Sequence, residues 1–124
     1  MELTKAVEKN DIEKVKMLID KGADVNAKDD TDSTALMYAA WRGRTEGLKM
    51  LIDKGADMNA SNKFGSTALI DATRRGHTEC LKMLIEQGAD VNAKDNCDKT
   101  ALIYATRYGR TECLKMLIDA GARK

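Results

Sequence analysis

Several features that would point to a membrane protein or to a charged ligand are missing from this sequence. Its 124 residues include no proline, and no apolar run approaches the roughly 20 residues that a transmembrane helix needs. The first residues, MELTKAVEKNDIEK, are charged and hold no apolar signal region. The net charge is +1, so the charge balance favours no nucleic-acid, membrane or acidic partner in particular.

The sequence also lacks the motifs of catalysis and of cofactor or metal binding. His77 is the single histidine, and no motif places it beside Cys97. A nucleophile needs a base within hydrogen-bonding reach. No cysteine and histidine have zinc spacing, and no glycine loop is of the phosphate-binding kind. We therefore predict no enzyme activity, no cofactor and no metal.

The cysteine content predicts free thiols. Three cysteines is an odd number, and Cys80 and Cys113 lie in apolar stretches of helical character. Small buried residues of this kind are more typical of a core than of a ligand set. Together with the missing signal region, they predict a reduced, cytoplasmic protein.

The main positive feature is a repeat with a period of 33 residues. The octet TECLKMLI occurs at 78–85 and 111–118, and the near copy TEGLKMLI occurs at 45–52. The triplet Thr-Ala-Leu recurs with the same step. Self-similarity at a fixed period is typical of repeat architectures. We predict a single domain, 1–124, with repeats at 1–30, 31–63, 64–96 and 97–124.

Each repeat has the pattern of two helices joined by a short turn. In the second repeat Thr34 is placed to cap a helix that runs through ALMYAAWR and ends at Gly43. The next helix runs through TEGLKMLIDK with an apolar stripe at helical spacing, and Gly55 ends it. No repeat could bury its apolar face alone, so we expect stacked neighbours to form one continuous core.

The pattern closely resembles the ankyrin repeat family. The period, the paired helices and the segment GADVNAKD all match, and the resemblance covers essentially the whole chain. It implies an all-α solenoid of stacked helix-turn-helix units joined by β-turn loops. The family motif T-P-L-H reads TALM or TALI here. The turn glycine survives only as Gly65, and Asp32 and Asp98 replace it with a residue that tolerates positive φ.

The two ends of the predicted stack differ. The first repeat carries Lys14 where later repeats carry Gly47, Cys80 and Cys113, which suits a polar cap. The last repeat keeps its apolar stripe as far as Ile118, so we expect apolar surface at that end. Three interpretations stay open: the chain is a fragment, this end self-associates, or a frayed end is tolerated. Gly47 either weakens its helix or allows close approach of a bulky neighbour.

Function is expected where the repeats differ, in the turns and along the first helices. The ankyrin resemblance places these segments on one concave face that binds partners. They contain every aromatic residue of the chain, and the helix ends are basic, with Arg44 and Arg110 among them. Aromatic residues and arginine are enriched at binding hot spots. The predicted partner-binding residues are Tyr38, Trp41, Arg42, Phe64, Arg74, Arg75, Tyr104, Arg107 and Tyr108.

We therefore predict a non-enzymatic module that binds a protein partner through the concave face. Arginines at helix C-termini, and tyrosines packed into the stack, need no partner. A structural scaffold with no dedicated partner is thus one alternative. Another is an acidic or nucleic-acid ligand held by the arginines, although acidic turns argue against it. Similar repeats with varied contact positions are also typical of designed ankyrin binders, whereas framework changes such as Gly47 and Gln87 favour drift; both origins stay open.

Overall fold

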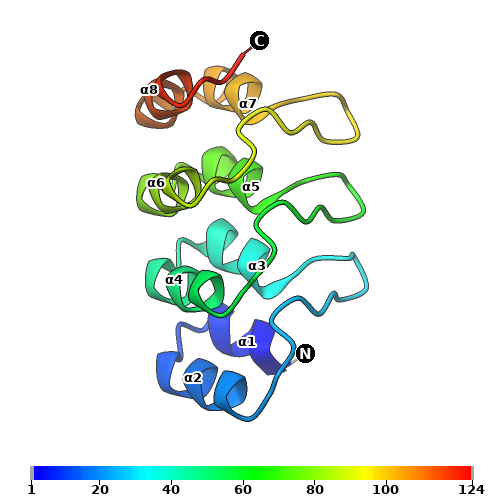
Figure 1. Cartoon of the computed structure of the whole chain (residues 1–124). Helices are drawn as coiled ribbons and strands as arrows, with labels where there is room; N and C mark the ends of the chain where they lie inside the picture. The colour runs from blue at the N-terminus through cyan, green and yellow to red at the C-terminus, as the bar shows by residue number, and fades with distance from the viewer. Residues whose placement is uncertain (1, 124) are drawn as a thin grey trace.

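A computed structural model describes residues 2–123, and all regular secondary structure in this range is helical. Eight helices of the described chain stack in four pairs (Figure 1). They are α1 (Glu2–Glu8), α2 (Ile12–Asp20), α3 (Ala35–Arg42), α4 (Thr45–Asp53), α5 (Ala68–Arg75), α6 (Thr78–Glu86), α7 (Ala101–Arg107) and α8 (Thr111–Asp119). The predicted all-α solenoid is confirmed. None of these helices is both long and apolar enough to cross a membrane.

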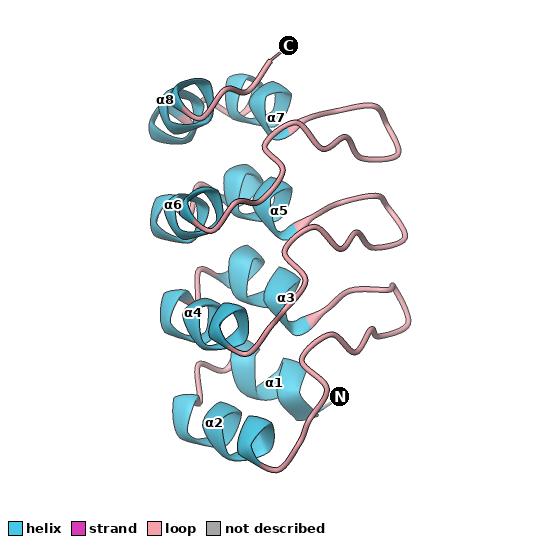
Figure 2. Cartoon of the chain, in the orientation of Figure 1, coloured by secondary structure: helices cyan, strands magenta, loops and turns pink. Residues whose placement is uncertain are grey.

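The helices form two rows. The first helices of the pairs, α1, α3, α5 and α7, lie in one row, and the second helices, α2, α4, α6 and α8, lie in the other (Figure 1). Each helix packs against its partner and against the next helix of its own row. Three long loops project from the first row, on the side away from the second row (Figure 2). The loops and the first helices therefore enclose an angle along one side of the stack.

Side-chain caps and glycines set the ends of the first helices. Thr34, Thr67 and Thr100 each accept a hydrogen bond from the backbone N–H three residues further on. This satisfies one of the N–H groups that a helix start leaves without a partner. Gly43 and Gly76 end α3 and α5 in the left-handed conformation, with φ of 70° and 73°. The predicted caps are confirmed.

The three projecting loops share one backbone conformation. Asp32 and Asp98 adopt φ of 60° and 63°, close to the 76° of Gly65, so the expected positive φ of these aspartates is confirmed. One side-chain oxygen at the start of each loop accepts hydrogen bonds from the backbone N–H groups two and four residues on. The residues that supply this oxygen are Asp29, Asn62 and Asp95.

A ladder of asparagines, which follow the second helices in the chain, joins successive helix pairs. The side-chain oxygen of Asn26 accepts from the backbone N–H of Asp57 at 2.7 Å. Asn59 and Asn92 make the same bond one and two repeats later. These asparagines recur in the sequence because each connects its own repeat to the next.

The core runs through the whole stack and ends in an exposed apolar surface. Lys14 is exposed at the first pair, as expected for a polar cap. At the last pair, Leu102, Ile103 and Leu114 line an open groove of about 630 Å³, and Ile118 is 55% exposed. In the preceding repeat, the residues equivalent to Leu102, Ile103 and Leu114 are buried because α7 and α8 cover them. The expected apolar end is confirmed.

The open question about Gly47 has a structural answer. A Cβ atom added to this buried residue would lie 3.7 Å from Cγ1 of Val7 and 3.8 Å from Cβ of Arg44. Both distances are ordinary van der Waals contacts. No bulky neighbour requires a glycine there, so Gly47 only weakens its helix.

Candidate functional site

The predicted binding residues lie on the surface between the loops and the first helices. We call this surface, formed by α3, α5, α7 and the loops before them, the concave face. It contains the one tryptophan, the one phenylalanine and the three tyrosines of the chain. The concave face is therefore where apolar anchors for a partner are concentrated.

Trp41 begins a row of alternating rings and cations. The guanidinium carbon of Arg75 lies 4.8 Å from the centroid of the Trp41 ring, and that of Arg74 lies 5.6 Å from it. Arg74 is also 4.9 Å from the ring of Tyr104, which stacks on Tyr108 with centroids 6.1 Å apart. Contacts of cations with aromatic faces are attractive, by about 0.5–1 kcal/mol at exposed sites. Five of the predicted residues thus form a continuous row across three helix pairs, which we call the aromatic–arginine row.

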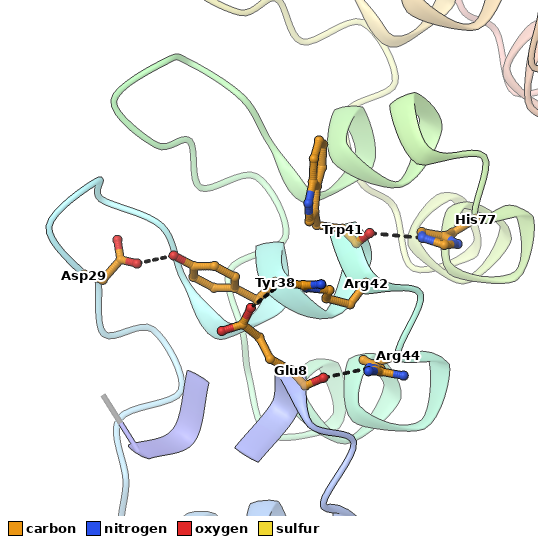
Figure 3. Close-up of polar contacts among 7 residues, drawn as sticks. All are labelled: Glu8, Asp29, Tyr38, Trp41, Arg42, Arg44 and His77. Atoms are coloured by element: carbon orange, nitrogen blue, oxygen red, sulfur yellow. Dashed lines mark hydrogen bonds and ion pairs between the residues drawn. The ribbon is translucent and has the colours of Figure 1, made fainter. Parts of the chain in front are cut away.

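The tyrosines of α3 and α7 are tied to the loops. The hydroxyl of Tyr38 donates to Asp29 (Figure 3), and that of Tyr104 donates to Asp95. Burial opposes ionisation of Asp29, but the bond from Tyr38 and those from the loop lower its pKa to about 2. Burial and the Asp95 carboxylate raise the pKa of Tyr104 to about 12. Tyr104 is only 7% exposed, so it holds the loop in place and offers a partner little surface.

The remaining predicted residues lie outside the aromatic–arginine row. Arg42 makes an ion pair with Glu8, with 3.3 Å between Nη2 and Oε2 (Figure 3). Phe64 lies in the loop before α5 and is 66% exposed, a large apolar side chain in water. Arg107 lines the apolar groove at the last helix pair. The structure therefore separates Arg107 from the others and pairs Arg42, which stays 53% exposed, with Glu8.

A second ladder has a role that the sequence did not reveal. Nε of Arg44 donates to the backbone carbonyl of Glu8 at 2.9 Å, and Nε2 of His77 lies 3.0 Å from the carbonyl of Trp41 (Figure 3). Arg110 makes the equivalent bond to the third pair. A carbonyl only accepts, so Nε2 of His77 carries the proton. The spacing of one period between Arg44, His77 and Arg110 is the signal in the sequence, but the charge of the two arginines favours contacts with a partner instead.

Two family models match the chain. The one described as ankyrin repeats (3 copies) matches residues 54–124, more than half of the sequence. The one described as ankyrin repeats (many copies) matches residues 3–52. The chain belongs to the ankyrin repeat family. A comparison with curated proteins gave no match. Ankyrin repeats are generally modules for protein–protein interaction.

Two of the three thiols of this ankyrin stack are part of its packed core. Cys80 and Cys113 are buried, and burial raises the pKa of both thiols, which makes them poor nucleophiles. Cys97 is exposed on a loop, and all three cysteines are free. Across residues 2–123, no group of three or more His, Cys, Asp or Glu side chains is arranged to hold a metal ion.

Proposed function

We propose that this ankyrin chain acts as one domain, residues 1–124, that binds a protein partner through its concave face and catalyses no reaction. The observation that carries the proposal is the aromatic–arginine row, which lies beside the exposed Phe64. Its side chains are of the types that dominate binding hot spots. Contacts between rings and cations already hold them in place, so less side-chain freedom is lost when a partner binds.

The acidic or nucleic-acid alternative has weaker support. Backbone phosphates are bound by arginines whose guanidinium groups face the ligand. Here Arg44 and Arg110 donate to backbone carbonyls, Arg42 pairs with Glu8, and Arg74 lies between two aromatic rings. The predicted basic groove is thus largely committed to contacts within the stack. A steep loss of affinity with added salt would favour this alternative over a protein partner.

The proposal predicts that three exposed residues decide partner capture. The variant Phe64→Ser, Arg75→Ala and Tyr108→Ala changes only exposed side chains, so it is expected to fold like the parent. A single hot-spot residue contributes about 2 kcal/mol or more, so loss of even one of the three is expected to weaken binding by at least about 30-fold. Affinity capture from a cell lysate with mass spectrometry identifies the partner, and calorimetry then measures the dissociation constants.

A matched control carries Lys49→Ala, Lys82→Ala and Lys115→Ala, three exposed changes on the row of second helices. It is expected to retain the partner as the parent does. Equal recovery with the concave-face variant and with the control contradicts the proposed surface. If the parent retains nothing, the scaffold alternative is favoured.

We also infer that the apolar groove at the last repeat supports self-association through a second copy of the chain. Such a groove is covered by the next repeat everywhere else in the stack, and here Ile118 stands exposed beside it. The first repeat presents the exposed, charged Lys14 instead, which favours contact between two C-terminal ends.

This inference predicts concentration-dependent dimers in sedimentation velocity, and monomers only after Ile118→Lys. Burying an unpaired lysine in an apolar interface is unfavourable, so the expected loss of association is more than tenfold. Met17→Lys, an exposed apolar position at the opposite end, is the control and is expected to associate like the parent. A parent that stays monomeric at high concentration overturns the inference.

A further inference from the structure

The third repeat breaks a pattern that its neighbours share. Tyr38 and Tyr104 occupy equivalent positions on α3 and α7, and each donates its hydroxyl to an aspartate of the preceding loop. On α5 this position is Asp71, and the loop residue that would accept the bond is Asn62. The helix α5 therefore lacks the tyrosine ring and carries a carboxylate in its position. The loop before α5 lacks the aspartate that would accept the bond from the ring.

A cavity of about 240 Å³ lies between the second and third repeats at this place. Asp71 and Ser66 line it on the side of the third repeat, Tyr38 and Trp41 line it on the side of the second, and Asn62 lines it from the loop before α5. Because the loop and helix residues that would flank a tyrosine ring at position 71 are those that line the cavity, the cavity corresponds to the missing side chain.

The last repeat shows how a ring lies in the equivalent space. The ring of Tyr104 packs on the guanidinium of Arg74, 4.9 Å from its centroid. Arg74 is one period after Trp41, so a ring in the cavity would lie against Trp41 in the same way. Phe64 also lines the cavity, and it is mostly exposed. Aromatic pairs of this kind contribute about 0.5–1.5 kcal/mol beyond the area that they bury.

Asp71 is an unfavourable residue for stability alone. Its side chain is only 7% exposed, and Oδ1 accepts a hydrogen bond from Oγ of Ser66 at 2.7 Å. The ion pairs found among residues 2–123 do not include it. A buried carboxylate that makes no direct ion pair is destabilising. Residues that break a local rule in this way are expected at functional positions.

We propose that the cavity is a subsite for a tyrosine side chain of the protein partner, with the Asp71 carboxylate accepting a hydrogen bond from the phenol. The subsite rests on the proposed function, because it lies on the concave face. Its volume is below the roughly 300–1,000 Å³ of pockets for drug-sized ligands and suits one side chain. The partner would supply across the interface the ring and hydroxyl that the second and fourth repeats supply internally.

The charges around the cavity favour a phenol over a lysine. A lysine ammonium would also pair with a carboxylate, but Arg74 lines the same cavity and Arg75 lies over the ring of Trp41. A further cation would be repelled by both guanidinium groups. A neutral phenol donates a hydrogen bond to Asp71 without this repulsion, and its ring is attracted to the neighbouring cations.

A titration with amino-acid amides tests the subsite directly. The probes are N-acetyl-tyrosinamide, N-acetyl-phenylalaninamide and N-acetyl-lysinamide, added to ¹⁵N-labelled protein. Trp41 is the single tryptophan, so its indole N–H gives one unambiguous signal from the cavity wall. We expect saturable shifts of this signal and of the Ser66 amide with the tyrosine probe. The phenylalanine probe is expected to bind about tenfold more weakly, because it has no hydroxyl to donate to the carboxylate.

Two variants separate the subsite from a general effect on the fold. Asn62→Asp with Asp71→Tyr reproduces the pairing of the other repeats and fills the cavity from inside, so binding of the tyrosine probe should disappear while the protein stays folded. Asp71→Asn keeps the shape and removes the charge, so it should weaken the tyrosine probe several-fold and leave the phenylalanine probe unchanged. A lysine probe that binds more tightly than tyrosine, or an Asp71→Asn variant with unchanged affinity for tyrosine, overturns the subsite.

The titration needs no partner, so its failure is distinguishable from failure of the proposed function. A partner that is lost with the concave-face variant, combined with no response to the tyrosine probe, overturns the subsite and leaves the binding face. A response to the tyrosine probe combined with equal capture by the concave-face variant supports the subsite chemistry and contradicts the wider surface.

Discussion

Asp71→Asn is expected to raise the free energy of unfolding at pH 8 by about 1–3 kcal/mol and to leave it almost unchanged at pH 4. Burial raises the pKa of the Asp71 carboxyl from its ordinary value of 3.8 to about 6, although the hydrogen bond from Ser66 and the charge of Arg74 both act to lower it. The ionised form is therefore unfavourable in the folded protein. Asparagine keeps the shape of the side chain and has no charge to bury.

The direction of the pH dependence follows from the raised pKa. Between pH 3.8 and about 6 the folded protein holds a proton that the unfolded chain releases, so the contribution of Asp71 to stability falls as the pH rises through this window. Above it the full penalty applies, and one pKa unit corresponds to about 1.36 kcal/mol. Asp29 and Asp95 have lowered pKa values, so their contributions are lost only as the pH falls below 3.8.

Urea denaturation of the parent and of Asp71→Asn at several pH values between 4 and 8 measures this effect. Taking the difference between the two proteins cancels every group that both share. A stability difference that is the same at pH 4 and pH 8 would contradict a penalty from the buried charge. A variant that is more stable but binds the tyrosine probe more weakly would show that the third repeat gives up stability for its subsite.

Gly43→Ala is expected to destabilise the protein by about 2–4 kcal/mol, more than the same change at an equivalent glycine. Gly43 ends α3 with φ of 70°, a left-handed conformation that costs about 1 kcal/mol or more for alanine. A Cβ atom there would lie 2.7 Å from Nδ1 and 2.8 Å from Cε1 of His77. The imidazole would have to move, and it would lose its hydrogen bond to the carbonyl of Trp41.

Gly109→Ala is the matched control for this effect. Gly109 has φ of 65°, close to that of Gly43, but an added Cβ atom would meet no atom within 4 Å. Only the backbone strain applies, so we expect a loss of about 1 kcal/mol. Chemical denaturation of both variants measures the difference. Equal losses at the two glycines would contradict the role of His77. In a His77→Ala background, the cost of Gly43→Ala should fall to that of Gly109→Ala.

The ladder at the starts of the second helices and the row on the concave face have a common consequence for binding. The ladder of Arg44, His77 and Arg110 fixes each helix pair to the one before it, and the aromatic–arginine row bridges three pairs on the exposed side. A partner therefore meets a surface that is already ordered. Preorganisation of this kind improves affinity because less freedom is lost on association.

The sequence by itself determined the repeat, the helices and their ends. The period of 33 residues, the threonine caps, the left-handed Gly43 and the positive φ of Asp32 and Asp98 were all predicted and are present in the structure. Each depends on interactions within a few residues along the chain, or on exact repetition. The apolar end of the described stack was also predictable, because the octet at 111–118 keeps the apolar residues that a following repeat covers in the earlier copies.

The tertiary structure alone decided what individual side chains of the concave face do. Arg44 and Arg110 donate to backbone carbonyls 36 residues earlier, and Tyr104 is buried although its position suggested a contact. The cavity at Asp71 depends on which side chains of two adjacent repeats face each other. A pattern along the chain shows which residue types share a face, but their contacts are set by packing between repeats. That packing separated the arginines committed to the stack from the exposed ones, and it formed a cavity where a tyrosine is missing.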